Sequence, residues 1–205
     1  MSIYLLKSRF QSLLRPIVAW LYRLGVTANQ VTVAACVASI GIGVLLIFRS
    51  GEPILFLIVP IWMFVRMALN AIDGMLAREF GQASLLGAYL NELTDVVSDA
   101  ALYLPFALVA PLSPWPVFAV IFTAALSEFA GVLGAANGLS RHYEGPMGKS
   151  DRAVVFGALG LWIGLSQDLA LWANTLLWVV AGLALVTAAN RTRAGLRELH
   201  ERRGG

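Results

Sequence analysis

Residues 53–77 read PILFLIVPIWMFVRMALNAIDGMLA, and only Arg66 and Asp73 carry a charge in this run. A transmembrane helix needs about 20 consecutive, mostly apolar residues. The segment therefore predicts a helix that crosses a membrane. Because ionisable side chains are costly inside a bilayer, the two charged residues also mark it as a candidate functional segment.

The composition of the whole chain agrees with a membrane protein. Of its 205 residues, 59% are hydrophobic and 13% are charged, and the mean hydropathy is +0.75. A soluble domain carries about 25% charged residues, so this composition excludes a water-soluble globule and a disordered chain. The single cysteine, Cys36, excludes an internal disulfide framework.

Five further runs have the composition of membrane spans. They cover residues 31–48, 84–110, 117–137, 153–165 and 169–190. Residues 3–24 precede them and mix apolar with basic side chains, a pattern typical of an amphipathic helix in the membrane interface. We therefore expect one all-α integral membrane domain over residues 1–205, with six transmembrane helices after an N-terminal interfacial helix.

The distribution of basic residues predicts the orientation of these spans, because segments rich in Lys and Arg stay in the cytoplasm. Thirteen of the fifteen fall on one side of a six-span topology, and Arg49 and Arg66 are the exceptions. The thirteen are Lys7, Arg9, Arg15, Arg23, Arg78, Arg141, Lys149, Arg152, Arg191, Arg193, Arg197, Arg202 and Arg203. Both termini should therefore be cytoplasmic, and the net charge of +3 indicates membrane orientation rather than a nucleic-acid partner.

Polar side chains recur at helical intervals on the second and third predicted spans. Asn70 and Asp73 share a face of the second span, and Asn91 and Asp95 share a face of the third. The two spans are antiparallel and joined by a short link around residues 80–83, so these four side chains should meet. Two carboxylates and two amide oxygens suit Mg²⁺ or Mn²⁺.

Three further residues complete this candidate site. Gly74 and Gly87 place no side chain beside the oxygen cluster, so a ligand can approach the backbone there. Arg78 supplies a bidentate donor for phosphate at its edge. The pattern predicts a site for a metal and a diphosphate just inside the membrane.

One helical turn deeper, Arg66 and Asp99 should form an ion pair, with Glu128 of the fourth span as a third member. Such a buried pair can also serve only to fix the register of two helices. Asn70 and Asn91 can equally be hydrogen-bonding contacts between helices. Both alternatives stay open at the level of sequence.

The segment from Asn70 to Asp95 resembles the motif of the CDP-alcohol phosphotransferase family, also called CDP-alcohol phosphatidyltransferases. That motif reads D-x2-D-G-x2-A-R-x8-G-x3-D-x3-D. Six of its eight fixed positions match, namely Asp73, Gly74, Ala77, Arg78, Gly87 and Asp95. Asn70 and Asn91 replace the first and third aspartates, which resembles a bacterial subgroup of the family and implies a location in the bacterial inner membrane.

The resemblance implies an activity and roles for the matched residues. Family members transfer a phosphatidyl group from a CDP-linked lipid such as CDP-diacylglycerol to a small polar alcohol and release CMP. The implied ligands of Mg²⁺ or Mn²⁺ are Asp73, Asp95, Asn70 and Asn91. The implied substrate-binding residues are Gly74, Ala77, Arg78, Gly87 and Lys149. Asp95 would also take the proton of the acceptor hydroxyl, and the resemblance further implies a homodimer.

Two alternatives belong to other functional classes. A catalytically degenerate homologue would bind lipid or a partner enzyme without turnover, and the asparagines at positions 70 and 91 motivate this hypothesis. A small transporter is less well supported, because the chain has no pair of similarly interrupted helices of the kind found in inverted repeats.

Overall fold

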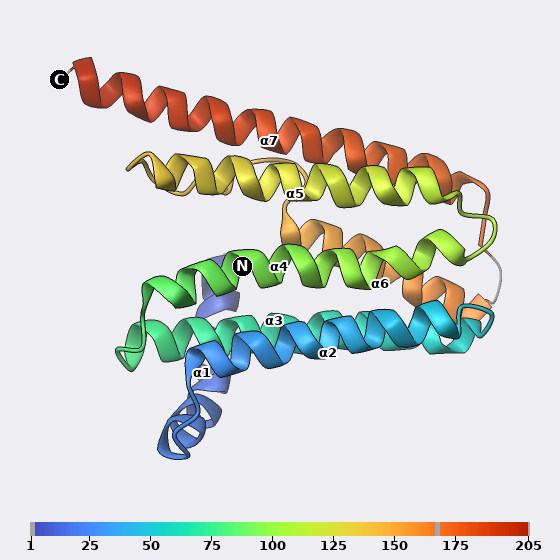
Figure 1. The fold of residues 1–205 in the computed structure, drawn as a ribbon, viewed down its shortest axis with the longest axis horizontal. Coiled ribbons are helices and arrows are strands. Elements are labelled where there is room, and N and C mark those ends of the chain that lie inside the picture. Colours follow the sequence, from blue (N-terminus) through green and yellow to red (C-terminus); the bar gives the residue numbers. More distant parts are fainter. Residues whose placement is uncertain (1–2, 167–168, 205) are drawn as a thin grey trace.

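The computed structural model describes residues 3–166 and 169–204, with side chains over residues 10–166 and 169–202, and its regular elements are all helices there (Figure 1). The α-helices are α1 (Ile3–Arg23), α2 (Ala28–Phe48), α3 (Ile58–Glu79), α4 (Leu85–Tyr103), α5 (Pro114–Ala136), α6 (Lys149–Ser166) and α7 (Trp172–Gly204). Two short 3-10 helices, η1 (Pro53–Leu57) and η2 (Leu104–Leu108), precede α3 and follow α4. The all-α prediction is confirmed.

Helices α2 to α7 run along the long axis of the molecule, and α1 crosses them near one end (Figure 1). The pairs α5–α7 and α2–α4 make the most extensive contacts, while α3 packs against α1, α2 and α6. Gly43 allows α2 to approach α4 closely, because a Cβ there would lie 2.2 Å from the carbonyl oxygen of Ala101. Helix α4 is therefore held close beside α2. This packing fixes α4 as one wall of the candidate active site.

Four stretches of the described residues are long and apolar enough to cross a membrane. They are Ala28–Phe48, Pro53–Glu79, Pro114–Ala136 and Trp172–Arg202. Helices α4 and α6 are not among them, since each carries three charged side chains. The fold is therefore that of an integral membrane protein, and the number of six spans stays a prediction. Three of the basic residues that predict the orientation have side chains that the structure does not describe. They are Lys7, Arg9 and Arg203.

Local signals explain where the helices begin. Helix α2 begins at Ala28, before the predicted start at residue 31, because Thr27 and Gln30 form a capping box with reciprocal hydrogen bonds. Helix α5 begins at Pro114, and proline is favourable in the first helical turn. Helix α6 begins at Lys149, since its charged first turn precedes the apolar run at residues 153–165.

The bounds of three predicted spans differ from those of the helices at the same place in the chain. The span at 53–77 begins as η1 and becomes α-helical only at Ile58. The span at 84–110 is too long, because α4 ends at Tyr103 and the chain continues as η2 with a proline in its first turn. Helix α7, which contains most of the predicted span at 169–190, continues to Gly204. Polar side chains replace apolar ones in this extension.

Two buried clusters hold the bundle together. The larger one surrounds Tyr103 and Phe156, whose rings stack with centroids 3.8 Å apart. The smaller one joins α1 to α3 through Leu14 and Met75, among others. On the other side of α1, Trp20 is 53% exposed, an arrangement that suits the interfacial role predicted for this helix, which stays a prediction.

Candidate active site

A cavity of about 470 Å³ lies between α2, α3 and α4. All eight fixed positions of the sequence motif line it, namely Asn70, Asp73, Gly74, Ala77, Arg78, Gly87, Asn91 and Asp95. Helix α2 contributes Asn29 and Thr32, and the loop between α5 and α6 contributes Arg141 and Tyr143. The structure therefore brings together the residues that the sequence places on two separate spans.

The link between α3 and α4 positions the two motif halves. Gly81 has a φ of 68°, a left-handed conformation that glycine adopts without strain. The side chain of Gln82 accepts a 2.7 Å hydrogen bond from the backbone N–H of Ala28. Ser84 caps α4 by accepting a 3.0 Å hydrogen bond from the N–H of Gly87. These contacts fix the first turn of α4 beside the first turn of α2 and the last turn of α3.

Asp73 is held from the neighbouring helix α2. It is 6% exposed, and the hydroxyl of Thr32 donates a 2.8 Å hydrogen bond to its Oδ2. A buried charge without a partner is costly. Thr32 therefore stabilises and orients the carboxylate that the motif places next to Gly74.

Neighbouring polar side chains occupy the space beside both motif glycines. A Cβ at Gly74 would lie 2.8 Å from Nη2 of Arg78, which folds back over this position. A Cβ at Gly87 would lie 2.8 Å from Oδ1 of Asn29. The two glycines thus leave room in the cavity for hydrogen-bonding groups from α2 and α3.

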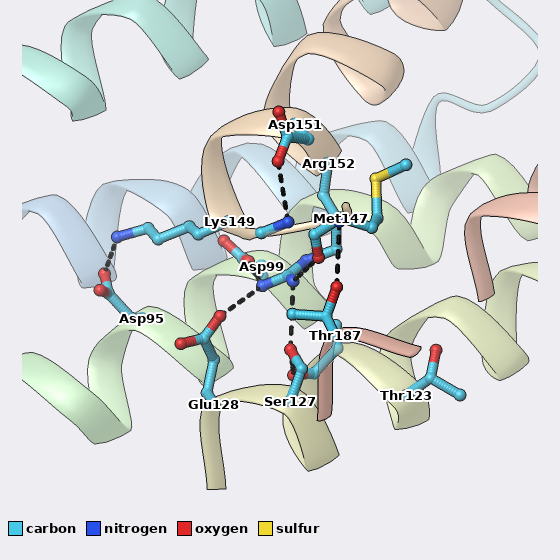
Figure 2. Close-up of polar contacts among 12 residues, drawn as sticks. Asp95, Asp99, Thr123, Ser127, Glu128, Met147, Lys149, Asp151, Arg152 and Thr187 are labelled. Atoms are coloured by element: carbon cyan, nitrogen blue, oxygen red, sulfur yellow. Dashed lines mark hydrogen bonds and ion pairs between the residues drawn. The ribbon is translucent and has the colours of Figure 1, made fainter. Parts of the chain in front are cut away.

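Asp95 is surrounded by donors that all contact the same oxygen, Oδ1. Nη2 of Arg66 lies 3.2 Å away, Nδ2 of Asn70 lies 3.4 Å away, and Nζ of Lys149 forms an ion pair with it (Figure 2). Among the described residues no hydrogen bond is made to Oδ2. One oxygen of Asp95 is therefore anchored, while the other is available to a ligand.

A buried ion network lies one helical turn deeper than Asp95. Arg66 and Asp99 pair at 2.5 Å, and Arg152 of α6 approaches Asp99 at 3.4 Å. Arg152 also pairs with Glu128 at 2.9 Å (Figure 2). Arg191 of α7 pairs with the same carboxylate at 3.0 Å. The predicted pair of Arg66 and Asp99 is present. Glu128 joins this pair through Arg152, which contacts both Asp99 and Glu128, and not by direct contact with Arg66.

Two residues of this network escape prediction from sequence. Arg152 is 0% exposed and Arg191 is 3% exposed, although the distribution of basic residues predicts both to lie on the cytoplasmic side. Arg152 falls at helical spacing with buried Phe156 and Ile163, and this shared face is the signal that could have identified it. No comparable local signal exists for Thr32, because its contact with Asp73 joins two helices.

Two further cavities meet the motif cavity. One of about 360 Å³ shares Asn91, Asp95 and Arg141 with it, and Lys149 lines its other side. The second is an apolar groove of about 550 Å³ between α3 and α6, and Asn70 lies at its polar end. The apolar residues of the groove include Pro60, Met63, Phe64, Met67, Val154 and Leu161. Such a junction can hold a molecule with a polar head and an apolar chain.

The oxygen groups around the motif cavity suit a hard divalent cation. They are the carboxylates of Asp73 and Asp95 and the side-chain amides of Asn70 and Asn91. The described residues contain no group of three or more His, Cys, Asp or Glu side chains placed to hold a metal ion. Among these four residues only the two aspartates carry negative charge, so phosphate oxygens of a bound substrate would have to complete the coordination.

Comparison with known proteins gives a consistent result. A family model described as CDP-alcohol phosphatidyltransferase matches residues 25–187. The chain is 49% identical over 197 residues to inner membrane protein YnbA of Escherichia coli, covering 96% of this chain and 97% of that protein. It is 30% identical over 209 residues to phosphatidylinositol phosphate synthase of Streptomyces avermitilis, covering 94% of this chain and 81% of that protein.

The fold is similar to that of phosphatidylinositol phosphate synthase PgsA1 of Mycobacterium tuberculosis. The structure of that protein with manganese and citrate gives a TM-score of 0.71 at 23% identity and covers 88% of each chain. Its structure with CDP-DAG bound gives a TM-score of 0.69 at 23% identity and covers 88% of this chain and 92% of that one. At this identity the likeness establishes the fold.

Proposed function

The chain belongs to the CDP-alcohol phosphatidyltransferase family, and from this premise we propose that it is a membrane enzyme of phospholipid synthesis. In the proposed reaction a phosphatidyl group passes from a CDP-linked lipid such as CDP-diacylglycerol to a small polar alcohol, and CMP is released. The observation that supports this best is the cavity lined by all eight motif positions. An apolar groove adjoins this cavity at Asn70.

The three cavities suggest how such a donor binds. The cytidine would lie against Gly74, Ala77 and Gly87, and Arg78 at the edge would contact the diphosphate. An acyl chain would lie in the groove between α3 and α6. A relative of the same fold, PgsA1, has been solved with CDP-DAG bound, which supports a lipid donor of this kind.

We propose that Mg²⁺ or Mn²⁺ acts at the site. The residues that would hold it are Asp73, Asp95, Asn70 and Asn91. When bound, a divalent cation would supply positive charge against the diphosphate of the donor. The structure of PgsA1 with manganese supports this choice of ion.

Asp95 is the proposed general base. The hydroxyl oxygen of the acceptor would attack the phosphorus of the phosphatidyl group, the bond from that phosphorus to CMP would break, and Asp95 would take the hydroxyl proton. Arg66, Asn70 and Lys149 hold Oδ1 of Asp95 in place. This leaves Oδ2 as the atom that would accept the proton.

Asp95→Asn tests this assignment. We expect CMP release from CDP-diacylglycerol and a panel of small alcohols to fall by roughly 10²–10⁴-fold, the usual contribution of a general base. Glu52→Gln is the control, because Glu52 pairs with Arg49 on the surface before η1, outside the site. A release rate in Asp95→Asn equal to that of the control would contradict the role of Asp95.

A second function is favoured by one observation. Asn70 and Asn91 stand where the motif has aspartates, and the amide of Asn70 donates to Asp95. A degenerate homologue that binds lipid or a partner enzyme without turnover would show this pattern. Calorimetry with CDP and Mg²⁺ separates the two: loss of metal-dependent CDP binding favours the homologue without turnover. Activity that appears only after Asn70→Asp and Asn91→Asp would also favour it.

The location of the protein follows from its helices and its relatives. It is a multi-pass inner membrane protein, as its apolar helices and the name of the Escherichia coli relative indicate. We propose that both termini are cytoplasmic, which would place the motif cavity next to the pool of water-soluble acceptors. The homodimer implied by the family resemblance stays a prediction.

A further inference from the structure

A short loop segment between α5 and α6 lies between the motif cavity and the end of α7. Residues 140–144, here called the strap, have no helical or strand structure. Successive side chains of an extended chain point to opposite sides. The contacts of the strap follow this alternation, so one set of side chains faces the site and the other faces α7.

Ser140 and His142, two even-numbered residues of the strap, contact α7 through the carboxylate of Glu198. Ser140 donates to Glu198 from its backbone N–H at 2.9 Å and from its hydroxyl at 3.0 Å. Nε2 of His142 lies 3.0 Å from the same carboxylate. Arg202 pairs with Glu198 at 2.5 Å and donates a 2.8 Å hydrogen bond to the carbonyl oxygen of Gly138, just before the strap.

The odd-numbered residues face the site. Arg141 and Tyr143 line both the motif cavity and the adjoining cavity beside Asp95. Arg141 pairs with Glu92 of α4 and lies 3.6 Å from Glu128 of α5. The strap therefore presents a cation and an aromatic ring to the space where the proposed substrates meet.

From these contacts we infer that Glu198 is a positioning residue, which holds Arg141 and Tyr143 over the substrate cavity by fixing the strap to α7. This inference rests on the proposed function, because it gives the strap a role in binding the CDP-linked donor. It also explains why α7 continues beyond residue 190 as a polar helix: Glu198 and Arg202 lie on that extension. Hydrogen bonds to a charged group are stronger than neutral ones, so one carboxylate can hold a loop that has no regular structure.

Hydrogen exchange on the full-length protein in detergent measures the strap directly. In Glu198→Ala the N–H of Ser140 loses its acceptor, and we expect its exchange to become roughly tenfold faster or more. Glu201→Ala is the matched control, because Glu201 is exposed on the same helix one turn away. Glu198→Gln, which keeps an acceptor oxygen, should give an intermediate rate. Unchanged exchange at Ser140 in Glu198→Ala would overturn the inference.

A double-mutant comparison tests whether Glu198 acts through Arg141. We expect Glu198→Ala and Arg141→Gln each to weaken CDP binding in the presence of Mg²⁺ by roughly tenfold, with thermal unfolding midpoints close to that of Glu201→Ala. The double variant should lose less CDP affinity than the product of the two single losses, because part of the effect of Glu198 acts through Arg141. Losses that multiply would overturn the inference. If the wild-type protein binds no CDP, the proposed function fails, and exchange at Ser140 alone then decides whether Glu198 holds the strap.

Discussion

At the level of single residues, the contact between Thr32 and Asp73 ties α2 to the site. Thr32→Val keeps the shape of the side chain but removes the donor to a buried carboxylate. A hydrogen bond to a charged group is worth about 1.5–3 kcal/mol, so we expect CMP release to fall roughly ten- to hundredfold. Thr123→Val is the control, since Thr123 is similarly buried but donates to carbonyl oxygens of its own helix. Equal rates in the two variants would exclude a role for Thr32.

The asparagine at position 70 gives a second prediction at this scale. Its amide donates to Asp95, so Asn70→Asp would remove this donor and place a second carboxylate beside Asp95. We expect the thermal midpoint of this variant to fall below that of wild type in EDTA, because like charges repel. Added Mg²⁺ should then raise the midpoint more in the variant than in the wild type, since a ligand that binds the folded state stabilises it. An equal Mg²⁺ shift in the two proteins would argue against a metal at this position.

At the scale of helices, Arg152 connects α6 to the carboxylates of α4 and α5. Removing one partner from a buried ion network leaves uncompensated charge, which costs about 3–5 kcal/mol. Arg152→Met should therefore lower the free energy of unfolding by about that amount. The measurement is a denaturant titration, with Arg193→Met on the exposed side of α7 as control. A loss no larger than that of the control would mean that the network adds little stability.

At the scale of helices, some features of the fold and of the site can be predicted from local sequence and others cannot. The apolar runs and the helical spacing of polar residues are local features, and they sufficed to predict the all-α fold and to place Asp73 and Asp95 on facing helices. The end of α4 and the long extension of α7 depend on Pro105 and on contacts made outside the apolar runs. Periodicity within α6 places Arg152 on the buried face of that helix. Its partners Asp99 and Glu128 lie far along the chain, so one helix alone cannot identify them.

At the scale of the whole molecule, the side of the membrane that the motif cavity faces decides which substrates can reach it. A donor with acyl chains needs the bilayer, whereas CMP and a small alcohol are soluble in water. The cavity lies between α2, α3 and α4 beside the α3–α4 link, and the positive-inside rule predicts that this link is cytoplasmic. A cytoplasmic cavity would therefore give both substrates access to Asp95.

Cysteine labelling in intact cells tests this orientation. Cys36 is the single cysteine and is buried, so Cys36→Ala gives a background without reactive thiols. In that background Arg193→Cys, at an exposed position of α7, should react with a membrane-impermeant maleimide only after the inner membrane is broken. Gly51 follows the last turn of α2, at the end of that helix away from the motif cavity, and a side chain there meets open space. Gly51→Cys should therefore react once the outer membrane is permeable. The reverse pattern would place the cavity on the periplasmic side, where a cytoplasmic acceptor cannot reach Asp95.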